Sequence, residues 1–328
     1  MRAWRLHTSD AGTEPRVDEI ARPEPGPGQL LLRMRAAGLN RGELIGHGAH
    51  GHAAAAAPLA LGGEAAGEVV AIGADVRGWH RGDRAMGRCR GAFADFVLLE
   101  AYEAMAVPLA LDWPHAGALP LTFLVVYDML VQQGRLRDGQ TLLVAGITSG
   151  VGVAALQAAK AIGARVIGTS GSAAKLARLK QEGLDLGLQT RGADFVDAVR
   201  EATGGRGADL AIDAVGGSVF AACLRSLAFE GRLAMVGYVD GVLKGEIDLE
   251  ALHAKRLTVF GVSNKLRTPE QRAQTVRAFA ADWLSLFAAG RLRPLVDQVH
   301  PFDALPRALD AMQHDEHVGK IVLAGSPD

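Results

Sequence analysis

The stretch TLLVAGITSGVGVAALQ at residues 141–157 decides the fold. Its first third is an apolar run typical of a buried strand, and its last third has the pattern of an amphipathic helix. Between them lie Gly146, Gly150 and Gly152, which allow a sharp turn and a close approach of the backbone. This order of strand, glycine-rich turn and helix predicts a dinucleotide site, with the pyrophosphate on the N–H groups of the helix N-terminus.

The glycine pattern is weak evidence by itself. The third glycine of the usual fingerprint is replaced by Ala154 or Ala155, and an ordinary glycine-rich turn would look similar. The surrounding sequence strengthens the prediction of a dinucleotide site. From about residue 119 to 263, apolar strands alternate with helical patterns, which predicts a doubly wound parallel sheet. The residues expected to bind the cofactor at this turn are Gly146, Ser149, Gly150, Val151 and Gly152.

The chain on either side has a different character. Before residue 119 it consists of short strand patterns, such as 29–38, 67–73 and 94–100, separated by glycine and proline, which predicts a partly open β-barrel. After residue 263 come a long helix at about 269–289 and a closing strand, GKIVL. The sequence is therefore expected to form two domains.

Composition narrows the function classes. The 328 residues have a formal net charge of −1, so the chain has no excess of positive charge that would favour binding to nucleic acid or to an anionic membrane. The two cysteines, Cys89 and Cys223, are too few for a disulfide framework and suit a reducing compartment. No apolar signal core or membrane-spanning run occurs, so a cytoplasmic protein is expected.

The strand at 164–170 bears on the choice of dinucleotide. NAD-binding folds place a carboxylate at this strand end to bind the ribose diol. Here the residues are Thr169 to Ser172, and Lys175 follows within one turn, with Arg178 and Arg191 nearby. Hydroxyls and a cation suit a 2′-phosphate, so Ser170 and Lys175 favour NADPH. The alternative is that Lys175 merely lies on a solvated helix face.

Three motifs then resemble a known family: AGITSGVG at 145–152, GTSGSAAK at 168–175 and ATGGRGADLAIDAVGG at 202–217. They are similar to zinc-independent members of the medium-chain dehydrogenase/reductase superfamily, in the quinone oxidoreductase and zeta-crystallin branch. The resemblance implies a GroES-like catalytic domain at 1–118 and 264–328, and a Rossmann domain at 119–263. It also implies NADPH between the two domains.

The resemblance assigns further residues by position. Gly150, Val151 and Gly152 would contact the pyrophosphate, while Ser170 and Lys175 would contact the 2′-phosphate. Thr190 stands where a tyrosine often packs near the adenosine phosphate. The loops at Gly237 and at Val262 to Asn264 would flank the nicotinamide.

No metal is expected. Zinc-dependent relatives place a cysteine early in the barrel and a Gly-His-Glu about 25 residues later, whereas this chain has Asn40 and Gly63 at those positions. Without a thiolate and an imidazole, no tetrahedral site remains there. The histidines of HGAHGH, His47, His50 and His52, form an alternative cluster, but no fourth ligand is evident.

Asn40 and Glu43 are the candidate catalytic residues, since they correspond to the asparagine and acidic residue that this branch keeps beside the nicotinamide. The Asn40 amide would donate to a carbonyl oxygen as negative charge develops on it. The alternative is that Asn40 caps the following turn, and both roles are compatible.

The expected function is NADPH-dependent reduction of a quinone or an α,β-unsaturated carbonyl compound, by hydride transfer without a metal. Two alternatives stay open: an enoyl-thioester reductase and a non-catalytic NADPH-binding protein. The resemblance also implies a homodimer joined through the strand at 257–263, which is expected at the sheet edge, where unpaired backbone groups favour pairing with a second copy. The alternative is an edge covered by the chain's own C-terminal helix.

Overall fold

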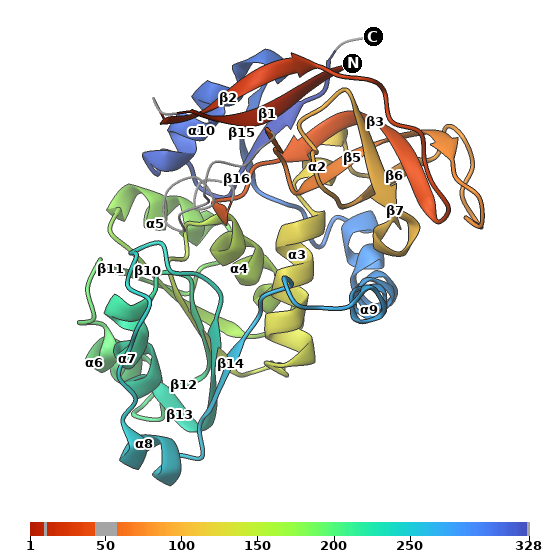
Figure 1. Cartoon of the computed structure of the whole chain (residues 1–328). Helices are drawn as coiled ribbons and strands as arrows, with labels where there is room; N and C mark the ends of the chain where they lie inside the picture. The colour runs from red at the N-terminus through yellow and green to blue at the C-terminus, as the bar shows by residue number, and fades with distance from the viewer. Residues whose placement is uncertain (10–11, 43–57, 327–328) are drawn as a thin grey trace. The chain divides into compact units, whose positions relative to one another are not determined.

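The computed structural model describes residues 1–9, 12–42 and 58–326 (Figure 1). The chain forms two compact units. The first unit comprises Met1–Leu124 and Thr268–Asp328, and the second comprises Val125–Arg267.

The first unit is built on two sheets. A three-stranded sheet has the order β2-β1-β4, and a seven-stranded sheet has the order β15-β16-β3-β5-β6-β8, with β7 also paired to β3. Its strands are β1 (Arg2–Ser9), β2 (Gly12–Glu19), β3 (Gln29–Gly38), β4 (Leu59–Ala60), β5 (Glu64–Ile72), β6 (Arg84–Arg88), β7 (Phe96–Glu100), β8 (Met105–Ala106), β15 (Val296–His300) and β16 (Lys320–Ala324).

Strand β3 pairs antiparallel with β5, β7 and β16 and therefore lies in the middle of the larger sheet. Its side chains Leu30, Leu32 and Met34 are almost completely buried. The helical segments are α2 (Trp113–Gly117), α9 (Pro269–Ala288), α10 (Leu305–Gln313) and the 3₁₀ turns η1 (Ala101–Glu103) and η3 (Phe302–Ala304).

Helix α9 confirms the long helix expected at about 269–289. It begins with a capping box, in which the Thr268 hydroxyl accepts a hydrogen bond from the Gln271 N–H and the Gln271 side chain accepts one from the Thr268 N–H. Pro269 follows at the first helical position, where its fixed φ is favourable. The buried face of the helix packs Phe279 and Phe287 together, with ring centroids 6.2 Å apart.

The second unit is a parallel sheet of six strands in the order β11-β10-β9-β12-β13-β14. Its strands are β9 (Thr141–Ala145), β10 (Arg165–Ser170), β11 (Leu186–Gln189), β12 (Ala208–Asp213), β13 (Leu227–Met235) and β14 (Thr258–Gly261). Its helices are α4 (Gly150–Ile162), α5 (Ala173–Gln181), α6 (Val196–Ala202), α7 (Gly217–Arg225) and α8 (Leu249–Ala254). Helix α3 (Pro120–Tyr127) begins in the first unit and ends in the second, where the π-helical segment η2 (Asp128–Gln132) follows.

Strand β9 shows how the buried side chains of this sheet pack against its helices. All five residues of the strand are buried, as expected for a parallel strand covered on both faces. Leu143 and Ala145 belong to one apolar cluster with Val199 of α6 and Val219 of α7. Helix α4 also packs on β9, as well as on β10. The expected fold class, a GroES-like sheet domain with a doubly wound Rossmann sheet, is confirmed.

One predicted helix is too long. From sequence alone, the apolar pattern of VFAACLRSLA at 219–228 predicts a single helix within the alternating strands and helices of 119–263, but α7 ends at Arg225 and Leu227 already belongs to β13. Leu227 pairs with Ala208 of β12, so pairing within the sheet overrides the local helical pattern. Strand β14 does occupy an edge of the sheet, and the dimer expected there stays a prediction.

Candidate active site

The glycine-rich turn after β9 forms the start of α4. Ser149 is the N-cap: its hydroxyl accepts a hydrogen bond from the Gly152 N–H at 3.1 Å and donates one to the Gly146 carbonyl at 2.9 Å. The turn is also tied to the end of β10, since the Ile147 N–H donates to the Thr169 carbonyl at 3.1 Å. The helix N-terminus is therefore fixed before any ligand binds, which suits an anion site.

Two glycines of this turn are required by its geometry, Gly146 by its backbone conformation and Gly152 by lack of space. Gly146 has a φ of +81°, in the region that favours glycine. A Cβ on Gly152 would lie 2.6 Å from the carbonyl oxygen of Ile147 and 2.7 Å from that of Gly146, and neither backbone atom can move aside cheaply. Bare backbone at a helix N-terminus is the cradle that a dinucleotide pyrophosphate requires.

The other predicted cofactor residues gather at the same edge of the sheet. The register pairs Ala145 with Thr169 and with Asp213, so the ends of β9, β10 and β12 are level. Because the strands are parallel, the segments that follow them emerge side by side. The predicted residues at this edge, besides the glycine-rich turn, are Ser170, Lys175, Thr190, Gly237, Val262 and Asn264.

Each nicotinamide-flanking candidate follows one of the last two strands. The Gly237 N–H donates to the Asp213 carbonyl at 3.3 Å, and a Cβ on Gly237 would lie 3.0 Å from the Ala214 carbonyl oxygen. Val262 is buried, while Asn264 is half-buried and its carbonyl accepts from the Arg267 N–H at 3.3 Å. Their contacts with a cofactor stay predictions.

The ends of β10 and β11 lie together. Ser170 is buried, its hydroxyl accepts from the Ser172 N–H at 3.3 Å, and its carbonyl accepts from the Thr190 N–H at 3.0 Å. Lys175 is half-buried in the first turn of α5. The Thr190 hydroxyl is engaged locally, since it donates to Asp194. This segment therefore brings the hydroxyls of Ser170 and Ser172 to the start of α5, where the Lys175 N–H donates to the Ser172 hydroxyl at 3.3 Å.

Arg191 is a residue to which sequence reasoning gave too little weight. Its side chain packs over Gly171 in the turn between β10 and α5, where a Cβ would lie 2.9 Å from the Arg191 Cδ. Among the described residues, no carboxylate lies within ion-pair distance of its guanidinium. The only sequence signal was an arginine two residues beyond β11, which by itself does not show that the side chain reaches back to the neighbouring turn.

Asp213 is a second residue that the sequence did not single out. It ends β12, is fully buried, and its Oδ1 accepts hydrogen bonds of 2.9 Å from the Val215 and Gly216 N–H groups. Its Oδ2 has no hydrogen-bond partner among the described residues. Burial, with a further contribution from Asp240, raises the pKa of Asp213 to about 6.

In the first unit, the catalytic candidate Asn40 belongs to a buried polar cluster. Its Nδ2 donates to Glu64 Oε1 at 2.9 Å and to the Gly38 carbonyl at 3.3 Å, and its Oδ1 accepts from the Lys320 ammonium at 2.8 Å. Lys320 was missed by sequence reasoning. The signal available was a lysine opening an apolar strand, HVGKIVL, but the sequence cannot show which distant groups it meets.

The remaining site candidates lie outside the described residues, namely Glu43 and the histidines His47, His50 and His52. Within 1–9, 12–42 and 58–326, no group of three or more histidine, cysteine or acidic side chains is arranged to hold a metal ion. Cys223 is fully buried, and burial together with the nearby Asp213 carboxylate raises the pKa of its thiol.

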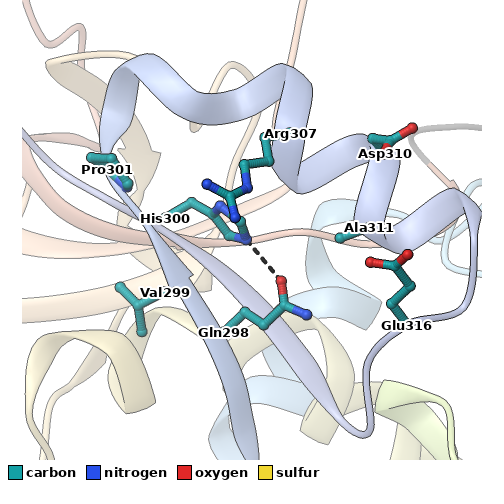
Figure 2. A pocket seen from close by; sticks show the side chains of 8 residues that line it. All are labelled: Gln298, Val299, His300, Pro301, Arg307, Asp310, Ala311 and Glu316. Carbon is teal, nitrogen blue, oxygen red and sulfur yellow. Dashed lines mark hydrogen bonds between the residues drawn. The ribbon is translucent and has the colours of Figure 1, made fainter.

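A separate hollow of about 560 Å³ lies in the first unit between β15 and α10 (Figure 2). His300 Nε2 and Gln298 Oε1 are 2.9 Å apart within it. Burial, and then the charge of Arg307, lower the pKa of His300. The hollow contains none of the predicted site residues. Its lining consists of Gln298, Val299, His300, Pro301, Arg307, Asp310, Ala311 and Glu316.

Comparison with known proteins places the chain in a family. Residues 26–109 match the family model described as alcohol dehydrogenase GroES-like domain, and residues 150–282 match that of zinc-binding dehydrogenase. The human synaptic vesicle membrane protein VAT-1 homolog is 30% identical over 323 residues, which cover 94% of this chain and 82% of the relative. The chain belongs to the medium-chain dehydrogenase/reductase superfamily. It is thus a member of a superfamily of oxidoreductases, as predicted.

Solved structures agree with this assignment. A mycobacterial quinone oxidoreductase has a TM-score of 0.84 and 28% sequence identity, with 99% of this chain and 100% of that chain covered. The mycobacterial protein Rv1454c complexed with NADPH has a TM-score of 0.86 and 28% identity, with the same coverage. Among the described helices, none combines the length and the apolar character needed to cross a bilayer.

Proposed function

We propose that this protein is an NADPH-dependent oxidoreductase that reduces a quinone or an α,β-unsaturated carbonyl compound. The main support is the carboxyl edge of the parallel sheet, where a capped helix N-terminus with glycine at its first and third positions lies level with the hydroxyl-lined turn after β10. The solved neighbours complexed with NADPH and described as a quinone oxidoreductase agree with this choice.

The residues of the second unit fit NADPH. The pyrophosphate would be bound by the N–H groups of Gly150, Val151 and Gly152 at the start of α4. The 2′-phosphate would be bound by the Ser170 hydroxyl and the Lys175 ammonium, with the Arg191 guanidinium above the same turn. No acidic residue stands at the end of β10 to repel that phosphate.

The residues of the first unit limit the chemistry. Asn40 and Gly63 stand where zinc-dependent relatives have a thiolate and an imidazole, so this donor set does not suit a Lewis acid that stabilises an alkoxide. A conjugated acceptor needs less help, because it delocalises the developing charge. When bound, NADPH would supply the hydride. The chain would position the acceptor, donate a hydrogen bond from Asn40 to its oxygen, and leave protonation to water.

A panel of acceptors tests the proposal. Purified protein is mixed with NADPH and, separately, with a benzoquinone, a naphthoquinone, an enone, an enoyl thioester and a simple ketone. We expect NADPH oxidation with the quinones or the enone. Turnover confined to the enoyl thioester would assign the protein to the enoyl-thioester reductases instead. NADPH binding without oxidation by any acceptor would indicate a non-catalytic binding protein.

Asn40→Ala links this activity to a residue. We expect a ten- to hundredfold lower rate of hydride transfer in a single turnover, with NADPH affinity nearly unchanged, because one neutral donor is lost. The melting temperature is measured on the same preparation. A lower melting temperature with an unchanged transfer rate would leave Asn40 only its structural role.

A further inference from the structure

Lys320 is a fully bonded cation in the interior of the first unit. Only 4% of its surface is exposed, and its ammonium donates three hydrogen bonds of 2.8 Å, to the Leu39 carbonyl, Asn40 Oδ1 and Glu64 Oε1. A lysine ammonium has three donors, so each of them has an acceptor.

Glu64 is the matching anion and is completely buried. Its Oε1 accepts from both Lys320 Nζ and Asn40 Nδ2, and its Oε2 accepts from the Leu121 N–H at 2.7 Å. A buried ion pair is tolerated when such hydrogen bonds compensate for the lost solvation. The pair also links β5 and β16 with the start of α3.

The backbone brings these groups together from three distant parts of the sequence. Strand β16 pairs with β3 through Val322 and Gly38, and the Leu39 N–H donates to the Ile321 carbonyl at 3.0 Å. Gly38 makes room for the cluster, since a Cβ there would lie 3.0 Å from the Glu64 Cδ and 2.8 Å from the Gly117 carbonyl oxygen. The cluster is therefore a built feature of the sheet.

The charges on either side determine how the Asn40 amide is oriented. Its oxygen faces the Lys320 ammonium, and its nitrogen faces the Glu64 carboxylate. Rotation of the amide by 180° would place its N–H groups against a cation and its oxygen against an anion. Both contacts would then be repulsive, so the buried ion pair selects one of the two orientations.

We propose that Lys320 is a positioning residue, which acts with Glu64 to fix the Asn40 amide with one N–H on Glu64 Oε1 at 2.9 Å. The other N–H, which makes only a 3.3 Å contact with the Gly38 carbonyl, is then the donor that the acceptor oxygen shares during reduction. The inference rests on the proposed function, because it concerns the rate of hydride transfer to the acceptor. Lys320 also polarises the amide through its oxygen, which makes the N–H groups of Asn40 stronger donors.

A double variant tests this inference without leaving a buried charge uncompensated. Lys320→Met alone would leave the Glu64 carboxylate buried without its cation. It is therefore combined with Glu64→Gln, because a glutamine amide can pair with the Asn40 amide in either orientation. We expect hydride transfer in a single turnover to fall about tenfold, with NADPH affinity within twofold of the wild type. The matched control is Arg35→Met with Glu68→Gln, which removes the 2.8 Å ion pair between the adjacent strands β3 and β5 of the same sheet. That control is expected to transfer hydride at the wild-type rate.

A double-mutant cycle decides whether the effect passes through Asn40. Asn40→Ala is expected to lower the transfer rate ten- to hundredfold in the wild type but less than threefold in the double variant, since coupled residues are not additive. An equal loss in both backgrounds would overturn the inference. Should the double variant not fold, Lys320→Arg serves in its place. Arginine keeps the positive charge, but its planar guanidinium does not present three donors from one atom as the ammonium does. In the Lys320→Arg background, Asn40→Ala is therefore expected to lower the transfer rate by less than in the wild type.

A second measurement does not depend on activity. The side-chain amide protons of Asn40, assigned in NMR spectra by their loss in Asn40→Ala, are expected to exchange slowly with solvent in the wild type. In the double variant they are expected to exchange at least tenfold faster. Equal protection in both proteins would contradict the positioning role. A wild type that reduces no acceptor would contradict the proposed function and would leave this readout of the amide intact.

Discussion

The two candidate sites, one in each unit of the chain, are built in opposite ways. The turn at 146–152 uses almost no side chains, since glycine backbone, one serine cap and a helix N-terminus provide its chemistry. The cluster around Asn40 depends wholly on side chains, drawn from positions 40, 64 and 320. A local backbone site can therefore be recognised from a short stretch of sequence, whereas a site assembled from charged side chains requires the fold.

The buried carboxylates of the two units show the same contrast. Glu64 is compensated by the Lys320 ammonium as well as by two N–H donors. Asp213 is equally buried but has only two backbone N–H donors, both on one oxygen, and its pKa is raised to about 6. The difference is that the first unit pairs its buried carboxylate with a cation, while the second contains a buried carboxyl group with no cation beside it, and burial raises its pKa.

The largest effect is expected from adding a side chain to the backbone-built turn at 146–152. Gly152→Val would push against the Ile147 and Gly146 carbonyls and distort the start of α4. NADPH affinity is expected to fall at least a thousandfold, or about 4 kcal/mol, by calorimetric titration. Ala161→Gly is the control, because it weakens the same helix away from the turn. Near-normal affinity in Gly152→Val would remove the pyrophosphate from this turn.

The next effect concerns the choice between dinucleotides. The wild type is expected to bind NADPH at least tenfold more tightly than NADH, about 1.4 kcal/mol, and Lys175→Glu is expected to abolish this preference. Lys180→Glu makes the same charge change at an exposed position of the same helix and should preserve it. Equal affinity of the wild type for the two dinucleotides would refute the proposed 2′-phosphate site.

A smaller effect is expected from the uncompensated carboxyl group. Because the pKa of Asp213 is raised in the folded state, the folded protein binds a proton that the unfolded chain releases. The contribution to stability is therefore present at low pH and is lost as the pH rises through about 6. Relative to the wild type, Asp213→Asn should gain about 1.4 kcal/mol in free energy of unfolding between pH 5 and pH 7.5.

Urea unfolding at the two pH values measures that gain. The control is Asp197→Asn, an exposed aspartate on α6, for which the wild-type pH dependence should be unchanged. A difference between Asp213→Asn and the wild type that is independent of pH would show that Asp213 does not titrate in this range.

The smallest effect is expected from chelation. Treatment with a chelator, followed by gel filtration, should change neither the melting temperature nor the rate of NADPH oxidation, because Asn40 and Gly63 supply no thiolate or imidazole. Stoichiometric zinc by elemental analysis, lost together with activity, would contradict the prediction and direct attention to the histidines at 47, 50 and 52.

The sequence by itself determined the parallel sheet, the glycine-rich turn and the family, because these depend on local patterns that are contiguous in the chain. The strand at 29–38 and the helix after Thr268 were predictable for the same reason. Only the tertiary structure decided that Leu227 belongs to a strand, that Arg191 lies over Gly171, and that Lys320 meets Glu64 and Asn40. These contacts join residues far apart in the chain, and their free energies depend on burial and on partners that no local pattern specifies.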